Sequence, residues 1–268
     1  MSSMLSIKNV NKTFNIGTIN ENKVLNNVSL TLETGDFVTV IGGNGAGKST
    51  ILNMIAGVYP VDSGSITLDG VDITNLPEHK RAKYIGRVFQ DPMKGTAADM
   101  EIQENLAMAN RRGKKRGLSW GITKAESKHF YEIVKKLDLG LEERLSAKVG
   151  LLSGGQRQAL TLLMATIQKP DVLLLDEHTA ALDPKTAKKV LDITQQIIEE
   201  QNLTAIMVTH NMKDAITIGN RLVMMYEGKV IYDVKGEEKS KLKVDDLLKK
   251  FEEYSGDVFS NDRILLQK

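Results

Sequence analysis

The sequence predicts an α/β fold with a mainly parallel sheet, an N-terminal antiparallel β-subdomain and an inserted helical lobe. Continuous apolar runs at residues 37–41, 172–175 and 205–208 are typical of strands buried on both faces. Segments with helical spacing of apolar residues lie between these runs, and such alternation indicates a parallel sheet. Apolar and polar residues alternate at 5–10 and 30–33, which is typical of half-buried antiparallel strands.

Composition bounds the class of protein. The chain has 268 residues, enough to bury a full core as one large domain or as a domain with an inserted lobe. Its 36 basic and 34 acidic residues give a net charge of +2, which predicts neither a nucleic-acid binder nor an enzyme for acidic substrates. Cysteine is absent, which excludes disulfides and thiolate metal sites and favours a reducing cytosol. We expect no signal peptide and no membrane-spanning run.

The elements before residue 90 are expected to be strands, apart from one helix. That helix follows the run at 37–41, because apolar residues at 51–55 have helical spacing and Gly57 provides a stop. Strands are expected at 5–10, 30–33, 65–69 and 84–89.

Residues 91–165 are expected to form the inserted helical lobe. Residues 99–110 give one candidate helix. Thr123 and Glu126 have the spacing of a capping box, in which each residue bonds the other's backbone at a helix start. The helix that follows them carries apolar residues at helical spacing and is expected to stop at Gly140.

Two further helix starts can be read from short-range patterns. Ser153 and Gln156 again have the spacing of a capping box. Asp183 and Pro184 form a good N-cap and first-turn pair for the next helix. Both helices therefore begin at residues whose side chains favour a helix N-terminus.

The last third is expected to add a helix, a strand pair and a tail. The helix after Pro184 should turn Val190, Ile193 and Ile197 inward. Glu227-Gly228 lies between two apolar runs and predicts a hairpin. Residues 244–254 form an amphipathic helix, suited to packing or docking. The predicted organisation is one domain over 1–268, with an α/β core at 1–90 and 166–235, the lobe at 91–165 and a helical tail at 236–268.

A glycine-rich stretch lies where the strand at 37–41 turns into a helix. It reads Gly-x-x-x-x-Gly-Lys-Ser, the P-loop that cradles phosphates. Glycine lets backbone N–H groups approach phosphate oxygens, and the helix N-terminus adds partial positive charge. Lys48 supplies a charge for the outer phosphates and Ser49 can ligate magnesium. A turn without a ligand is the alternative, but residue types, order and flanking structure favour nucleotide binding. The predicted ATP-binding stretch is Gly42, Gly43, Asn44, Gly45, Ala46, Gly47, Lys48, Ser49 and Thr50.

Polar groups follow several of the predicted parallel strands. The P-loop, Gln90, the pair Asp176–Glu177 and His210 each lie at the carboxyl end of a strand. Ligands bind at that edge of such sheets, so we expect these groups to converge there.

A nucleoside triphosphate at this edge needs a metal, an activated water and a sensor for the γ-phosphate. Asp176 suits Mg²⁺, partly through water, and Glu177 suits the general base. Gln90 can reach the metal and the attacking water, and His210 can bond the γ-phosphate. Taken alone, each could be a solvated or satisfied polar residue, but the P-loop upstream favours the catalytic interpretation.

Several motifs follow one another along the chain: the P-loop, Gln90, Leu152-Ser153-Gly154-Gly155-Gln156, Asp176-Glu177, Ala181-Leu182-Asp183 and His210. With these motifs in the order of that family, the chain resembles the ATP-binding-cassette (ABC) ATPases over about residues 4–235. The resemblance implies that Ser153, Gly154, Gly155 and Gln156 are a signature that acts in trans on the site of a second subunit. It implies that Asp183 belongs to a subunit-crossing loop. It also implies that Phe14 stacks on adenine, with a core aromatic as the alternative.

One residue departs from the family pattern, which usually reads Asp-Glu-Pro-Thr after the apolar strand. Here His178 stands in place of proline. The change puts the rigidity of the loop in doubt but leaves the two carboxylates intact. We expect His178 to lie on the surface of the turn.

The resemblance implies an ATP- and Mg²⁺-dependent ATPase that energises a membrane transporter. The sequence from Asp176 to Pro184 is similar to that of one bacterial subgroup of these ATPases. Members of this subgroup accompany a lipoprotein receptor and permeases like those of branched-chain amino-acid importers. Some members are assigned to aromatic amino acids. Expected partners are a second copy of the chain, bound head to tail with ATP, and permease subunits at the inner face of the membrane. The alternative is a non-transport ABC ATPase of the iron–sulfur assembly type.

A nucleic-acid partner is not expected. The basic run at 111–116 has no interleaved aromatic residues, and the net charge is small. We expect the run to lie on a solvated loop or to face lipid headgroups near the permease.

Overall fold

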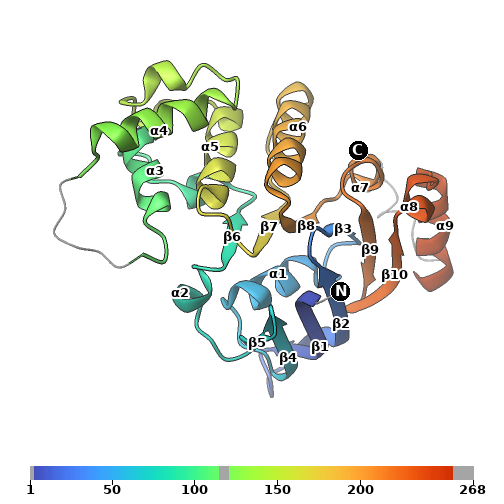
Figure 1. The fold of residues 1–268 in the computed structure, drawn as a ribbon. Coiled ribbons are helices and arrows are strands. Elements are labelled where there is room, and N and C mark those ends of the chain that lie inside the picture. The colour runs from blue at the N-terminus through green and yellow to red at the C-terminus, as the bar shows by residue number, and fades with distance from the viewer. Residues whose placement is uncertain (1–2, 115–120, 256–268) are drawn as a thin grey trace. The chain divides into compact units, whose positions relative to one another are not determined.

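The computed structural model describes residues 3–114 and 121–255 (Figure 1). Contacts divide the chain into two compact units. Unit 1 comprises Met1–Arg81 and Asn202–Lys268, and unit 2 comprises Ala82–Gln201. These bounds do not coincide with those of the lobe predicted at 91–165, and the division of the chain into core, lobe and tail stays a prediction.

Unit 1 begins with a four-stranded antiparallel sheet in the order β2-β1-β4-β5. This confirms the predicted N-terminal β-subdomain. A register shift separates Ile7 from Val10, and Asn9 between them has a φ of 50°. This bulge is the reason that both apolar residues are buried although an odd number of positions separates them. The strands are β1 (Ser3–Phe14), β2 (Asn22–Glu33), β4 (Ser63–Leu68) and β5 (Val71–Asp72).

The second group of strands in unit 1 has the order β10-β9-β3-β8. β3 is buried throughout and pairs in parallel with both β8 and β9, as its continuous apolar run predicts. β9 and β10 form the predicted hairpin, with positive φ at Glu227 (44°) and Gly228 (71°), as a two-residue type I′ turn requires. The strands are β3 (Phe37–Ile41), β8 (Thr204–Val208), β9 (Arg221–Tyr226) and β10 (Lys229–Lys235).

The C-terminal helix completes a core of unit 1. Leu247 and Phe251 are buried in one cluster with Ile41 and Met224. The Phe251 ring also meets the Tyr226 ring edge to face, with centroids 5.7 Å apart. The predicted amphipathic tail is therefore a packing element as far as the structure describes it. The helices of unit 1 are α1 (Lys48–Ala56), α2 (Glu78–Arg81), α7 (Met212–Thr217), α8 (Glu237–Ser240) and α9 (Val244–Ser255).

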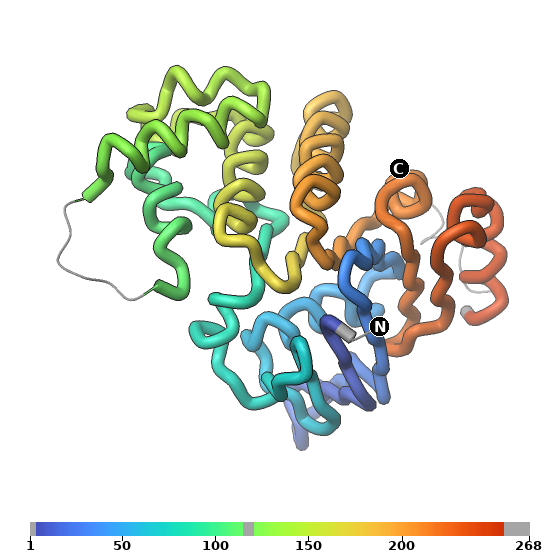
Figure 2. The backbone as a smooth tube through the Cα atoms, in the orientation of Figure 1, coloured from blue at the N-terminus to red at the C-terminus, as the bar shows by residue number. Residues whose placement is uncertain are grey.

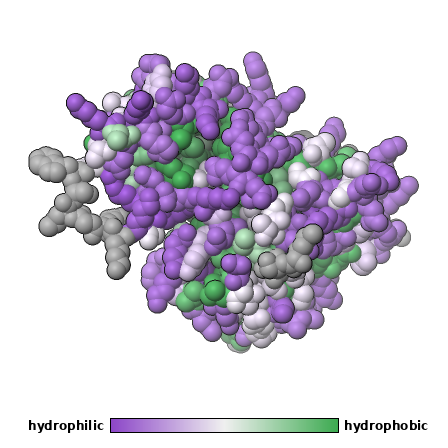
Figure 3. All heavy atoms as spheres, in the orientation of Figure 1, coloured by the Kyte–Doolittle hydropathy of each residue, from purple (hydrophilic) through white to green (hydrophobic). Residues whose placement is uncertain are grey.

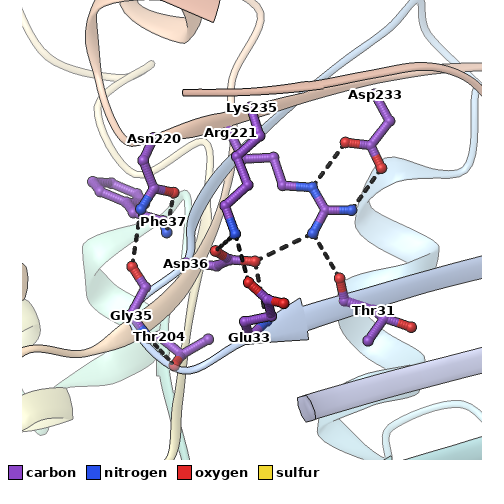
Figure 4. A network of polar contacts seen from close by, with 10 residues as sticks. All are labelled: Thr31, Glu33, Gly35, Asp36, Phe37, Thr204, Asn220, Arg221, Asp233 and Lys235. Carbon is purple, nitrogen blue, oxygen red and sulfur yellow. Dashed lines mark hydrogen bonds and ion pairs between the residues drawn. The ribbon is translucent and has the colours of Figure 1, made fainter. Parts of the chain in front are cut away.

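A network of charges holds the start of β3 (Figure 4). The buried carboxylate of Asp36 accepts from Arg221 at 3.2 Å and from Lys235 at 2.8 Å. The same two cations bond Asp233 and Glu33, at 2.6 and 2.8 Å. Its hydrogen bond to Asp233 raises the pKa of Arg221. These bonds fix the amino end of β3 against β9 and β10, and the glycine-rich loop follows its other end.

Unit 2 combines one pair of parallel strands with helices. β6 pairs with β7, so that Val88 lies beside Leu175. The helices α5 and α6 lie side by side (Figure 2). The bounds are β6 (Ile85–Val88), η1 (Pro92–Gly95), α3 (Ile102–Asn110), α4 (Lys124–Lys135), η2 (Glu142–Arg144), η3 (Val149–Leu151), α5 (Gly154–Thr166), β7 (Val172–Asp176) and α6 (Pro184–Gln201).

The helix starts of unit 2 follow the short-range patterns of the sequence. Thr123 and Glu126 form the predicted capping box of α4. Along α6, Val190 and Ile193 are buried as predicted, but Ile198 rather than Ile197 faces the core. The helical period allows either residue at the margin of the apolar face, and packing selects one.

The first residues of the basic run hold the helices of unit 2 together. Arg111 donates to Glu126 at 3.0 Å. Arg112 donates to the carbonyl oxygens of Ala165 and Gln168, both at 2.9 Å, and burial lowers its pKa. The prediction of a solvated loop is therefore wrong for these two arginines. Lys114 is exposed, and 115–116 lie outside the described residues.

Hydrophilic side chains predominate on the face of the molecule shown in Figure 3. The large hydrophobic side chains that are exposed in unit 2 include Met93, Met108 and Leu151. Among the helices of the described residues, none is long and apolar enough to cross a bilayer.

Candidate functional site

The glycine-rich loop of unit 1 connects β3 to α1 and leaves room at its centre. Gly42 has a φ of 152°, and a Cβ there would overlap the carbonyl oxygen of Met225. Gly45 has a φ of 78°, and a Cβ there would have no heavy atom within 4 Å. The loop is thus packed against β9 at one glycine and open at the other. An open glycine is what a backbone cradle for a phosphate needs.

Lys48 lies inside this loop. Its side chain is buried, and its ammonium donates to the carbonyl oxygens of Gly42 at 2.8 Å and Gly43 at 2.9 Å. The N-cap residue of α1 is Gly47, which has no side chain to cap the first-turn N–H groups. A compact cation and a helix start without a side-chain cap both favour an anion. These residues fit the phosphates of a nucleotide.

His210 follows the end of a strand next to the loop. β8 runs parallel to β3, with Val40 beside Val208, and the N–H of Thr209 donates to the Val40 carbonyl at 3.1 Å. Within unit 1, the structure therefore brings the half-buried His210 to the same strand ends as the phosphate loop.

Phe14 is the last residue of β1 and is half-buried. The Tyr59 ring meets it at 82° with centroids 5.2 Å apart, and the Lys12 ammonium lies 5.4 Å from its centroid. Phe14 is thus part of an aromatic pair with a cation beside it. Stacking of adenine on this ring stays a prediction.

Two carboxylates and an amide lie at the strand ends of unit 2. Asp176 ends β7, Glu177 follows it, and Gln90 comes two residues after β6. Because β6 and β7 are parallel neighbours, these residues share one edge of the pair. Glu177 has a φ of 46°, a left-handed conformation that is unfavourable for glutamate and is often kept at functional sites.

Magnesium fits this donor chemistry. Residues 3–114 and 121–255 contain no group of three or more His, Asp or Glu side chains that could hold a metal. Mg²⁺ commonly uses one or two protein ligands and completes its shell with phosphate oxygens and water. The predicted ligands Ser49, Asp176 and Gln90 are of the oxygen-bearing kind it prefers. The predicted convergence of the groups of unit 1 with those of unit 2 stays a prediction.

The signature residues open α5. Ser153 accepts from the N–H of Gln156 at 3.3 Å, and its own N–H donates to the Gln156 side chain at 3.1 Å. A Cβ on Gly155 would overlap the methyl group of Thr186, so close packing of α5 on α6 by itself requires this glycine. A Cβ on Gly154 would lie only 3.2 Å from Leu182.

The chain matches the family model described as ABC transporter over residues 25–180. It is 47% identical over 249 residues to the tyrosine transport ATP-binding protein of Clostridioides difficile, covering 93% of this chain and 99% of that relative. The chain belongs to the ABC transporter ATPases. It is also 36% identical to the spermidine/putrescine import ATP-binding protein PotA of Haemophilus influenzae over 86% of this chain, which spans 57% of that longer relative.

Solved ABC cassettes have the same fold. The dimeric structure of the cassette MJ0796 in a post-hydrolysis state, bound to ADP and Pi, superposes with a TM-score of 0.74 at 31% identity and covers 87% of this chain and 98% of that one. The ADP conformation of the cassette MJ1267 gives a TM-score of 0.76 at 26% identity, over 94% and 99% of the two chains. The protein is therefore an ABC ATPase that powers an importer, and the iron–sulfur assembly alternative finds no support among these relatives.

Asp183 caps the first turn of α6 in this ABC ATPase, as the sequence predicts. Its carboxylate accepts from the N–H of Thr186 at 3.1 Å. Hydrogen bonds from the Thr186 hydroxyl and N–H lower the pKa of Asp183. The side chain is exposed at the start of α6, and its part in a subunit-crossing loop stays a prediction.

His178 does not lie on the surface of the turn, and that prediction is wrong. Its side chain is only 2% exposed and its Nε2 lies 3.0 Å from the Thr194 hydroxyl on α6. Burial lowers the pKa of His178 to about 4. The sequence does hold a signal for its partner, because Thr194 stands between Val190 and Ile198 on the buried stripe of α6.

Proposed function

We propose that this ABC ATPase hydrolyses Mg²⁺-ATP with its own loop and carboxylates. The observation that carries the proposal is the buried ammonium of Lys48 inside a loop that is open at Gly45. Lys48 binds the outer phosphates, while Ser49 and Asp176 hold magnesium, partly through water. Bound magnesium supplies charge neutralisation for the phosphates. Glu177 takes a proton from the attacking water, which is the work of a general base.

Three further residues complete the proposed site. Gln90 contacts the metal and the water. It lies two residues after β6, in the segment that leads to the helices of unit 2. His210 bonds the γ-phosphate from the strand end beside the P-loop. Phe14 stacks on the adenine, which its half-buried ring allows.

We further propose that two copies bind ATP head to tail. The capped start of α5 presents Ser153 and the first-turn N–H groups to an anion. In a two-fold dimer, each copy can offer this helix start to the ATP of the other. The dimeric MJ0796 cassette, with 31% identity, supports this arrangement.

We propose that the solute is an aromatic amino acid. The support is the 47% identity to a tyrosine transport ATP-binding protein over almost the full length of both chains. In this proposal the ATPase lies peripherally at the inner face of the membrane, bound to permease subunits, and an extracytoplasmic receptor delivers the solute.

The test uses the transporter complex reconstituted in vesicles together with its receptor. ATP hydrolysis is measured with tyrosine, tryptophan, phenylalanine, leucine or spermidine as the solute. Tyrosine or another aromatic amino acid should stimulate hydrolysis several-fold, while leucine and spermidine leave it at the basal rate. Stimulation by leucine or spermidine alone would contradict the proposed solute class without touching the assignment of the ATPase site.

A further inference from the structure

A buried histidine lies directly beside the proposed general base. His178 follows Glu177 in the chain, and its imidazole packs into unit 2 instead of facing solvent. Its Nε2 is 3.0 Å from Oγ1 of Thr194, which lies in the middle of α6. The imidazole thus connects the first residues of the β7–α6 loop to the centre of the following helix.

The direction of this hydrogen bond follows from its neighbours. The Thr194 hydroxyl donates its single proton to the carbonyl oxygen of Val190 at 2.7 Å. Its oxygen can then only accept from the imidazole, so His178 carries its proton on Nε2. Both groups are buried, and neither can exchange this partner for water.

The loop between β7 and α6 is fixed at several points. The N–H of Ala180 donates to the Glu177 carbonyl at 3.0 Å, and that of Leu182 donates to Thr179 at 3.1 Å. The loop begins at the left-handed backbone of Glu177, an unfavourable conformation that only surrounding contacts can maintain. The bond from His178 is a contact that ties this strained point to α6.

We propose that His178 is a positioning residue: its Nε2–H bond to Thr194 holds Glu177 in the backbone conformation that directs its carboxylate. The inference rests on the proposed role of Glu177 as general base. The buried bond supplies the stiffness of the turn at this position. Since α6 also packs on α5 through Thr186 and Gly155, the bond places Glu177 in one packed body with the signature helix.

The test variant is Thr194→Val, which keeps the shape of the side chain and removes the acceptor. We expect kcat for ATP hydrolysis to fall on the order of 10-fold, because a small displacement of a catalytic group is costly. The KM for ATP should stay within twofold of wild type, since the P-loop is unchanged. Thr194→Ser keeps the hydroxyl and should therefore keep most of the wild-type kcat.

The matched control is Thr166→Val. Thr166 is a buried threonine of α5 that also donates to the carbonyl four residues earlier, at 2.9 Å, with no histidine attached. This variant should lose similar stability in denaturant unfolding and keep the wild-type kcat. A loss of kcat equal to that of Thr194→Val would overturn the proposal, because it would reduce the effect to general destabilisation.

The same comparison in a Glu177→Gln background distinguishes the positioning role of His178 from the proposed role of Glu177 as general base. With the base removed, Thr194→Val should leave the residual rate within twofold, because His178 acts through Glu177. A further 10-fold loss in that background, or a wild-type kcat for Thr194→Val alone, would overturn the positioning role. A wild-type rate for Glu177→Gln itself would instead contradict the proposed base.

Discussion

Glu177 combines a reactive carboxylate with a backbone conformation that few glutamates adopt. Its φ of 46° directs the chain away from β7 immediately after Asp176. Such conformations persist where the surrounding contacts over-determine them, as the loop bonds and His178 do here. At the scale of one residue, strain and chemistry therefore coincide at the position where the proposed mechanism needs a base.

Glu177→Gln should lower the rate of ATP hydrolysis by about 10²–10⁴-fold, because the amide keeps the shape of the side chain and cannot take a proton. Binding of ATP should survive, since the P-loop lies elsewhere in the chain. Steady-state hydrolysis and nucleotide-binding assays measure the two effects. Glu200→Gln, an exposed glutamate of the same unit, is the control and should hydrolyse normally. Unchanged hydrolysis by Glu177→Gln would remove Glu177 from the mechanism.

Among the elements of unit 1, α7 is held by a lysine from a different helix. Lys239 of α8 is buried and donates to the carbonyl oxygens of Ile216, Ile218 and Gly219, at 2.9, 2.5 and 3.0 Å. The last carbonyls of a helix lack partners within it, and a cation there also complements the helix dipole. Lys239 thus caps the C-terminal end of α7, the helix that begins two residues after His210.

This lysine should make stability depend on pH. Burial lowers the pKa of Lys239 to about 8 from its ordinary value of 10.5. Between these values the unfolded chain binds more protons than the folded one, so its contribution to the free energy of unfolding rises with pH. From pH 7 to 9.5, denaturant unfolding should show the free energy of unfolding of wild type rising by about 2 kcal/mol relative to that of Lys239→Met.

The exposed neighbour Lys241 provides the control for this measurement, because its side chain is 76% accessible. Lys241→Met should keep a constant difference from wild type across the same pH range. A constant difference for Lys239→Met as well would show that the lysine titrates in the fold as it does in the unfolded chain.

At the scale of the whole molecule, two of the helix starts in the described residues are proposed to bind an anion. One follows the P-loop and has no side-chain cap, and the other is the capped start of α5. One nucleotide in a single P-loop does not account for the second. The proposed head-to-tail dimer would use both, and because ATP alone offers the γ-phosphate, hydrolysis should release the dimer.

Ser153→Arg in a Glu177→Gln background tests this dimer. Light scattering with ATP should show a dimer for Glu177→Gln and a monomer for the double variant, because arginine fills the space of the γ-phosphate contact. Thr123→Arg in the same background is a matched control, since Thr123 caps α4 with the same box. It should lose about 1 kcal/mol of stability and still dimerise. A dimer of the Ser153→Arg double variant would exclude the signature from the interface.

Features that depend on neighbours along the chain could be predicted from the sequence. The P-loop, the capping boxes at Thr123 and Ser153, and the hairpin turn at Glu227 all rest on bonds between residues a few positions apart. Most of the strands could be predicted too, because continuous and alternating apolar runs reflect burial on two faces or one. The strand expected at 30–33 is longer, because β2 begins at Asn22. The sequence by itself therefore determined the family, the fold class and the candidate site residues. Its patterns do not predict the short elements β5, α2, α7 and α8.

Only the tertiary structure decided what distant segments do to one another. The sequence predicts that His178 is a turn residue on the surface, but in the fold it is buried against Thr194 of α6. The sequence predicts that Arg112 is solvated, but in the fold it donates to carbonyl oxygens at the end of α5. Along α6, packing chose Ile198 over Ile197. The physical reason is that burial and hydrogen-bond satisfaction depend on which surfaces meet, and a local pattern encodes only the preferences of each surface.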